Sequence, residues 1–163
     1  MITEVKADIL DLINKSSENK ALNVFIHCCN CHNNLGKGIA KAISTAYPEV
    51  ARADNATQAG DRAKLGTYTY ARVKENVVVA NAYSQYNYGW LNPLDSNGRQ
   101  TDYEALRKSL TAIRDDFTGR STHPVIFYVP KFIGQSNAKG NPRIIQPIVE
   151  EIFKDHELVL FYN

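Results

Sequence analysis

Residues able to hold an anion and to exchange a proton are crowded into one stretch, from His27 to Gly38. Histidine is the side chain that most readily exchanges a proton near neutral pH, and His27 and His32 both lie here. Glycine lets backbone N–H groups approach an oxyanion closely, and the start of a helix favours negative charge. An apolar run of strand length precedes the stretch, and apolar residues at helical spacing follow it. The pattern predicts an oxyanion site where a strand, a loop and a helix meet, with a titratable base beside it.

The three cysteines of this stretch suggest metal or redox chemistry, but the context argues against both. Cys28 to His32 matches the Cys-x-x-Cys-His pattern of covalent haem attachment, yet the only methionine is Met1. Cys28 and Cys31 make half a zinc site with no second cysteine pair, and a thioredoxin-type pair prefers a helix start. We therefore expect these small thiols to pack the end of the strand, and we expect no metal and no cofactor.

Each candidate residue taken alone also has a purely structural interpretation. Gly36-Lys37-Gly38 lacks the full dinucleotide or P-loop motif and is equally consistent with a simple turn into a helix. A histidine inside a strand, such as His27, is more often a hydrogen-bonded core residue than a catalyst. Asp8 is well placed to cap the helical turn that follows it. The tyrosines at 83, 86 and 88 fit either stacking on a ligand or packing of their own loop.

Composition and charge are those of an ordinary globular protein. The chain has 163 residues, of which 44% are apolar, and a formal net charge of +2. This charge is too small, and too evenly spread, to indicate a nucleic-acid partner. No apolar run approaches membrane-spanning length, and the N-terminal residues lack the apolar core of a signal peptide. An odd number of crowded cysteines is no disulfide framework, so we expect one cytoplasmic domain spanning residues 1–163, acting as a monomer away from membranes.

Strand and helix patterns alternate along the chain, which predicts an α/β domain with a largely parallel sheet covered on both faces. Thr101 to Glu104 reads as a capping box at the start of a helix whose apolar stripe runs from Tyr103 to Phe117. Ligands bind such sheets at the carboxyl ends of the strands. The loops that follow three of the strands, residues 28–38, 83–100 and 130–141, are therefore expected on one rim, around one cleft.

The motifs together resemble the macro domain family, which binds ADP-ribose. Lys6 to Leu10 is similar to the family's Gly-Asp-Ile segment, with Ala7 in place of glycine. Ile26 to Cys31, followed by Leu35 to Ala40, resembles the first phosphate loop. Its His-x-Cys-Asn-Cys form is similar to the branch typified by the yeast ADP-ribose 1″-phosphate phosphatase. Ile133 to Asn137 occupies the place of the second phosphate loop. The resemblance implies a three-layer α/β/α macro domain with a central mixed, largely parallel sheet.

The resemblance also implies a role for each matching residue. Three residues are expected at the adenine: Asp8, Ile9 and Phe161. The phosphates and the distal ribose are expected to be held by Asn30, Leu35, Gly36, Lys37, Gly38, Ile39, Gly134, Gln135, Ser136 and Asn137. His27 is the expected catalytic group near the 1″ position, with Asn30 fixing the ribose and His32 in reserve. From the long loop, Gln85 and Tyr86 are the contacts we expect first.

Three functions follow as expectations from the resemblance. The first is hydrolysis of ADP-ribose 1″-phosphate to ADP-ribose and phosphate. The second is removal of ADP-ribose from a modified protein or from an O-acyl derivative. The third is a non-catalytic reader of ADP-ribose. The residues between Gly134 and Gly140 include no Asp or Glu, which favours the reader, whereas His27 and Asn30 favour an enzyme. The expected partners are ADP-ribose or its 1″-derivatives and, for the second function, an ADP-ribosylated protein.

Overall fold

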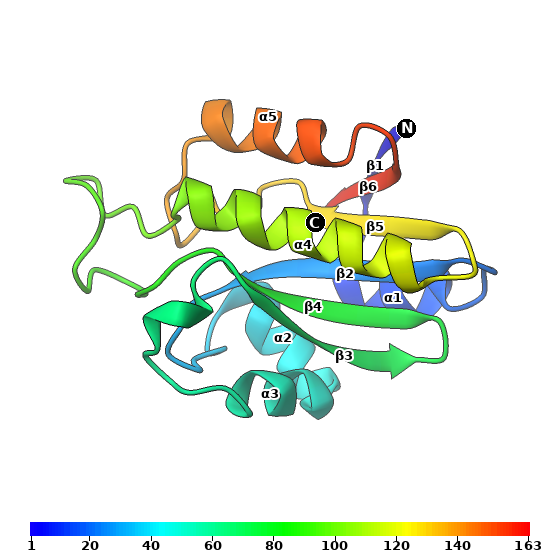
Figure 1. The fold of residues 1–163 in the computed structure, drawn as a ribbon, viewed down its shortest axis with the longest axis horizontal. Helices are drawn as coiled ribbons and strands as arrows, with labels where there is room; N and C mark the ends of the chain where they lie inside the picture. The colour runs from blue at the N-terminus through cyan, green and yellow to red at the C-terminus, as the bar shows by residue number, and fades with distance from the viewer.

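A six-stranded sheet runs through the middle of the molecule and carries helices on both faces (Figure 1). The computed structural model describes residues 1–163. In chain order the elements are β1 (Ile2–Lys6), α1 (Ile9–Ser16), β2 (Leu22–Cys29), α2 (Gly38–Ala46), α3 (Pro48–Asn55), the 3-10 turn η1 (Arg62–Lys64), β3 (Tyr68–Lys74), β4 (Val77–Tyr83), α4 (Tyr103–Arg120), β5 (Val125–Pro130), α5 (Pro142–Ile152) and β6 (Glu157–Tyr162).

The strands lie in the order β1-β6-β5-β2-β4-β3, and every neighbouring pair is parallel except β3 with β4. This confirms the predicted mixed, largely parallel sheet. β2 lies between β4 and β5, so that Val24 pairs with Val78 on one side and with Phe127 on the other. A strand enclosed in this way reads as a nearly continuous apolar run, which is the pattern of β2.

Two separate apolar cores hold the three layers together. On one face, α4 and α5 pack on the sheet, with Leu110 and Ile148 among the buried residues. On the other face α1, α2 and α3 cover the sheet, with Ile13, Ile43 and Val50 buried. The fold is therefore the expected three-layer α/β/α arrangement. No helix combines the length and the apolar character needed to cross a bilayer.

The structure corrects the predicted start of one helix. The N-cap of α4 is Asp102, whose side chain accepts a hydrogen bond from the Ala105 N–H at 3.0 Å. Thr101, the first residue of the predicted capping box, instead donates to the Gly134 carbonyl at 2.8 Å. Helix α5 begins at Pro142. Proline is well suited to the first helical position because it needs no N–H partner there.

The core beneath α4 yields a stability prediction. Leu110 is fully buried between α4 and the sheet. Leu110→Ala is expected to lower the free energy of unfolding by about 2–5 kcal/mol, because it removes buried methyl groups and leaves a cavity. Arg107→Ala, on the exposed side of the same helix, is the control and is expected to change it by less than about 0.5 kcal/mol. Urea unfolding followed by circular dichroism measures both; equal effects would contradict this packing.

Candidate functional site

A cleft of about 480 Å³ opens at the carboxyl ends of the parallel strands. Its wall is formed by the start of α1, the ends of β2, β5 and β6, the start of α2 and the loop after β5. The cleft lies on the sheet edge at which ligands bind in parallel α/β folds. Most of the residues predicted from the sequence line it, namely Asp8, Ile9, His27, Lys37, Gly38, Ile39, Gln85, Gly134, Gln135, Ser136, Asn137 and Phe161.

The first loop presents unpaired backbone donors at the start of α2. Lys37 is the N-cap of this helix, and its side chain makes no capping hydrogen bond. The N–H groups of Gly38, Ile39 and Ala40 donate to no acceptor in the protein. Gly38 has φ of +58°, a left-handed conformation that glycine adopts without strain. Exposed N–H groups and the helix dipole together make this end of α2 suitable for an oxyanion.

The second loop, residues 131–141, presents a matching set of donors. The N–H groups of Gly134, Ser136, Asn137 and Ala138 also donate to no acceptor in the protein. The loop is held from behind, because the Ala138 carbonyl accepts from the N–H groups of Gln100 and Thr101 at 2.8 and 3.2 Å. The two loops meet closely: a Cβ atom added to Gly38 would lie 3.8 Å from Nδ2 of Asn137. Seven unpaired amide donors therefore lie along one cleft.

The far end of the cleft combines one carboxylate with aromatic rings. Asp8 is the N-cap of α1, and its Oδ1 accepts from the Leu10 N–H at 2.8 Å. Phe161 is 3% exposed and packs in the core, with its ring centroid 6.1 Å from that of Phe25. Phe132, which the sequence analysis missed, is 54% exposed on the same wall. An apolar residue in an otherwise polar loop was the signal that could have found it.

His27 lines the cleft but is 2% exposed. Its Nε2 lies 2.6 Å from Oδ1 of Asn81 on the neighbouring strand β4. Burial lowers the pKa of His27 below its usual 6.5, against the opposing effects of the Asn81 hydrogen bond and the Asp54 charge. The imidazole is therefore neutral at pH 7, in the form of a base rather than an acid.

The thiols beside His27 are uncharged as well. Burial raises the pKa of Cys28, which lines the cleft, to about 11. Burial also raises the pKa of Cys29 well above its usual range. Cys29 and Cys31 pack in a small cluster with Tyr83, as expected for thiols that fill the strand end. No group of three histidine, cysteine or acidic side chains lies close enough together to hold a metal ion.

Five predicted residues lie outside the wall of the cleft and instead contact the first loop and its surroundings: Asn30, His32, Leu35, Gly36 and Tyr86. The Asn30 amide donates to the Asn34 carbonyl at 2.9 Å and accepts from the His32 N–H at 2.9 Å. The Gly36 N–H donates to the Asn34 side chain at 3.0 Å. Leu35 packs against the cluster of Cys29, Cys31 and Tyr83. These residues shape the loop that presents the amide donors.

His32 and Tyr86 pack against one another on the outer side of the loop. Nε2 of His32 lies 2.9 Å from Oδ1 of Asn87. The rings of His32 and Tyr86 pack edge to face, with their centroids 4.8 Å apart. The Tyr86 hydroxyl donates to the Gly60 carbonyl at 2.5 Å. Gln85, by contrast, lines the cleft while its side-chain amide donates to the Asn87 carbonyl at 2.8 Å. The long loop thus contributes Gln85 to the site and uses Tyr86 for its own packing.

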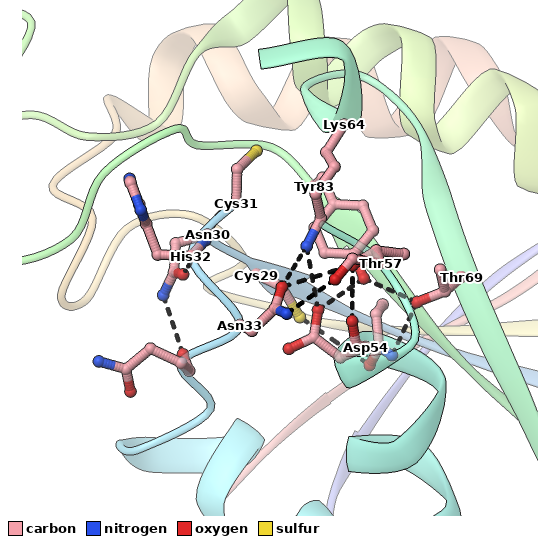
Figure 2. Close-up of polar contacts among 12 residues, drawn as sticks. Cys29, Asn30, Cys31, His32, Asn33, Asp54, Thr57, Lys64, Thr69 and Tyr83 are labelled. Carbon is pink, nitrogen blue, oxygen red and sulfur yellow. Dashed lines mark hydrogen bonds and ion pairs between the residues drawn. The ribbon is translucent and has the colours of Figure 1, made fainter. Parts of the chain in front are cut away.

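A buried ion pair lies behind the first loop (Figure 2). Nζ of Lys64 is 3.6 Å from Oδ1 of Asp54, and the two side chains are 6% and 1% exposed. The ammonium also donates to Oδ1 of Asn33 and lies over the Tyr83 ring, 4.4 Å from its centroid. Asn33 has φ of +56° and donates to the Thr57 carbonyl at 3.0 Å. Sequence reasoning missed this cluster, because its members are spread over more than fifty residues.

The charge of the cleft is low. Asp8 and Lys37 are the only acidic or basic side chains among the lining residues once His27 is neutral. An anion bound between the loops would therefore be held by backbone amides and Lys37, with no carboxylate beside it. This arrangement suits a diphosphate group joined to a part that the carboxylate of Asp8 can recognise.

Comparisons with known proteins bear on the fold. No family model matches the sequence. The chain is 28% identical to an uncharacterised 17.5 kDa protein of enterobacteria phage T4, over 98% of this chain and 95% of that protein. A protein of unknown function from Bacteroides thetaiotaomicron superposes with a TM-score of 0.74 at 22% identity, over 99% of this chain and 97% of that one.

Two further solved structures superpose on the chain: one is a macrodomain protein, and the other was solved with ADP-ribose. A macrodomain protein from Streptomyces coelicolor superposes with a TM-score of 0.68 at 19% identity, over 100% of this chain and 99% of that one. The DarTG protein of Thermosipho africanus, solved in complex with ADP-ribose, superposes with a TM-score of 0.68 at 12% identity, over 98% of this chain and 41% of that one. The chain therefore has the macrodomain fold.

Proposed function

We propose that the cleft binds ADP-ribose and that the protein hydrolyses ADP-ribose 1″-phosphate to ADP-ribose and phosphate. The observation that carries the binding proposal is the set of seven unpaired amide donors that two loops contribute to one cleft. The ADP-ribose complex of a protein with the same fold supports the choice of ligand. The similarity of the His-x-Cys-Asn-Cys segment to the phosphatase branch supports the choice of reaction.

In the proposed complex the free oxygen of the Asp8 carboxylate accepts from the adenine amino group. The unpaired N–H of Ile9 lies at the same end, and the exposed Phe132 ring stacks on the base. The pyrophosphate lies between the N–H groups of the two loops, around Gly38 and Asn137. Oriented amides supply the charge stabilisation there without reorganisation. The distal ribose then lies toward His27 and Gln85.

For the reaction, His27 is the proposed general base. It would take a proton from the water that attacks phosphorus. The bond between phosphorus and the 1″ oxygen then breaks, the attacking oxygen stays on the phosphate, and the protonated ring returns its proton to the 1″ oxygen of the departing ADP-ribose. The neutral state of the imidazole supports this role, because only the unprotonated ring can accept a proton. Asn30 and His32 act indirectly in this scheme, by shaping the loop that holds the phosphates.

A non-catalytic reader is the second candidate, and one observation favours it. Asp8 is the only acidic side chain that lines the cleft, and it lies at the proposed adenine end. A reader would bind ADP-ribose without turnover. Removal of ADP-ribose from a modified protein would show as release of ADP-ribose from that protein without phosphate release.

Replacing Asp8 tests the adenine end. Asp8→Asn keeps an oxygen that can cap α1 but presents an N–H group to the adenine amino group. It is expected to weaken ADP-ribose binding about tenfold, or 1.4 kcal/mol. Asp61→Asn is the matched control, because Asp61 caps η1 through the Ala63 N–H at 2.9 Å and lies outside the cleft. Calorimetric titration measures both; if wild type gives no binding heat, the proposal fails.

Replacing Phe132 tests the stacking role. Phe132→Ala is expected to weaken ADP-ribose binding about tenfold, since a base stacked on an aromatic ring gains roughly 1–3 kcal/mol. Leu94→Ala is the control, because Leu94 is similarly exposed but does not line the cleft. Equal affinities for the Phe132→Ala and wild-type proteins would remove Phe132 from the adenine site.

Replacing His27 tests the reaction. His27→Ala is expected to lower phosphate release from ADP-ribose 1″-phosphate by about 10²–10⁴-fold, measured with a chelator present. Because burial lowers the pKa of His27 below 6.5, wild-type turnover should fall to half its plateau value only below pH 6.5, as the imidazole takes up a proton. Circular dichroism verifies folding at each pH. Full turnover by a folded His27→Ala protein would exclude His27 as the base.

A further inference from the structure

The hydrogen bond between His27 and Asn81 joins the cleft to a chain of buried side chains. Nε2 of His27 and Oδ1 of Asn81 are 2.6 Å apart, with the two residues 2% and 0% exposed. The side-chain amide of Asn81 donates to the Thr69 hydroxyl. The Thr69 oxygen in turn lies 2.8 Å from the hydroxyl oxygen of Tyr83. The Tyr83 hydroxyl donates to Oδ1 of Asp54 at 2.6 Å, which is the last hydrogen bond of the series. Several of these side chains are drawn in Figure 2.

Asp54 sets the direction of every hydrogen bond in this chain. An ionised carboxylate can only accept, and the Asp54 carboxylate forms a buried ion pair with the Lys64 ammonium. The Tyr83 hydroxyl must therefore donate to Asp54. Burial, together with the hydrogen bond to Asp54, raises the pKa of Tyr83 far above its usual range, so the phenol keeps this proton. Because the Tyr83 hydroxyl gives its proton to the hydrogen bond with Asp54, its oxygen accepts from the Thr69 hydroxyl.

The same logic fixes the amide of Asn81. Because the Thr69 proton points to Tyr83, the Thr69 oxygen accepts from Nδ2 of Asn81 at 3.1 Å. Nδ2 also donates to the Val50 carbonyl at 3.2 Å. Two independent acceptors thus hold the nitrogen of the amide on the α3 and β3 side. The oxygen of the amide must then face His27, and a carbonyl oxygen carries no proton to give.

We propose that Asn81 is the positioning residue of this site: its side-chain carbonyl holds His27 in the tautomer that carries its proton on Nε2, which leaves Nδ1 as the basic nitrogen. The Cys29 thiol lies close to the ring, with its sulfur 3.7 Å from both ring nitrogens. The charged group that acts on the ring is Asp54, which is paired with Lys64. The assignment of the tautomer stands on these contacts alone.

The catalytic consequence rests on the proposed function. A base needs an unprotonated nitrogen that is always the same one, in a fixed orientation toward the attacking water. A ring that exchanged between tautomers would present Nδ1 in the wrong state for part of the time. The buried chain from Asp54 removes this exchange without placing a charge in contact with His27.

The first test reads the tautomer directly in the ligand-free protein. Long-range ¹H–¹⁵N correlation spectra at pH 7 distinguish a protonated from an unprotonated ring nitrogen. His27 is expected to show a protonated Nε2 and an unprotonated Nδ1, and His27→Gln identifies its signals among the four histidines. A protonated Nδ1, or signals averaged between the two tautomers, overturns the proposal whatever any variant does.

The second test changes the partner of the ring. Asn81→Asp places a carboxylate at hydrogen-bond distance from Nε2, which raises the pKa of His27, so the ring is expected to be protonated on both nitrogens at pH 7. Phosphate release should then fall about 100-fold, with ADP-ribose affinity unchanged, because Asn81 does not line the cleft. A spectrum of His27 in folded Asn81→Asp identical to that of wild type overturns the proposal.

A matched control exists in the adjacent loop. Asn87 contacts Nε2 of His32 at 2.9 Å through the same pair of atoms, so Asn87→Asp should shift the His32 signals and leave those of His27 in place. Failure of the proposed function is distinguishable, since a protein that neither binds ADP-ribose nor releases phosphate would still show the His27 tautomer. If Asn81→Asp does not fold, the wild-type spectrum decides the question.

Discussion

The buried ion pair of Asp54 and Lys64 is the interaction on which the architecture of the site depends. Two charges removed from water cost more free energy than their attraction returns unless further hydrogen bonds satisfy them. Here Tyr83 donates to the carboxylate and Asn33 accepts from the ammonium. One branch leads through Tyr83 toward His27, and the other leads through Asn33 into the first loop. A single buried pair therefore orients both a ring in the cleft and the loop that presents amide donors.

The rest of the cleft depends on the backbone rather than on charged side chains. Parallel strands bring the start of α2 and the loop after β5 to one edge of the sheet, where seven residues with unpaired N–H groups line the same cleft. Thr101 and Gln100 brace the second loop from behind. Donors held by a rigid scaffold need no reorganisation when an anion arrives, so the proposed diphosphate site needs only one lysine.

Local patterns were enough to predict much of the fold. The apolar run of β2, the glycines that follow it and the alternation of strands with helices predicted a largely parallel sheet covered on both faces. The resemblance to macro domains added that the sheet is mixed and lies in a three-layer fold. Helix starts were less accurate, because a capping side chain is chosen by its surroundings. Thr101 has the right residue type for a cap, but the Gly134 carbonyl competes for its hydroxyl and Asp102 takes the capping position.

The sequence by itself determined that two glycine-containing loops follow parallel strands and that Asp8 begins a helix beside them, since these features depend on neighbours along the chain. Only the tertiary structure decided which side chains face the cleft. Asn30 and His32 turn to partners within the loops, whereas Phe132 is left exposed on the wall. The link from Asp54 to His27 was equally invisible, because it joins residues from α3, β3, β4 and β2. Such contacts form only when the sheet brings its strands together, and no local spacing encodes them.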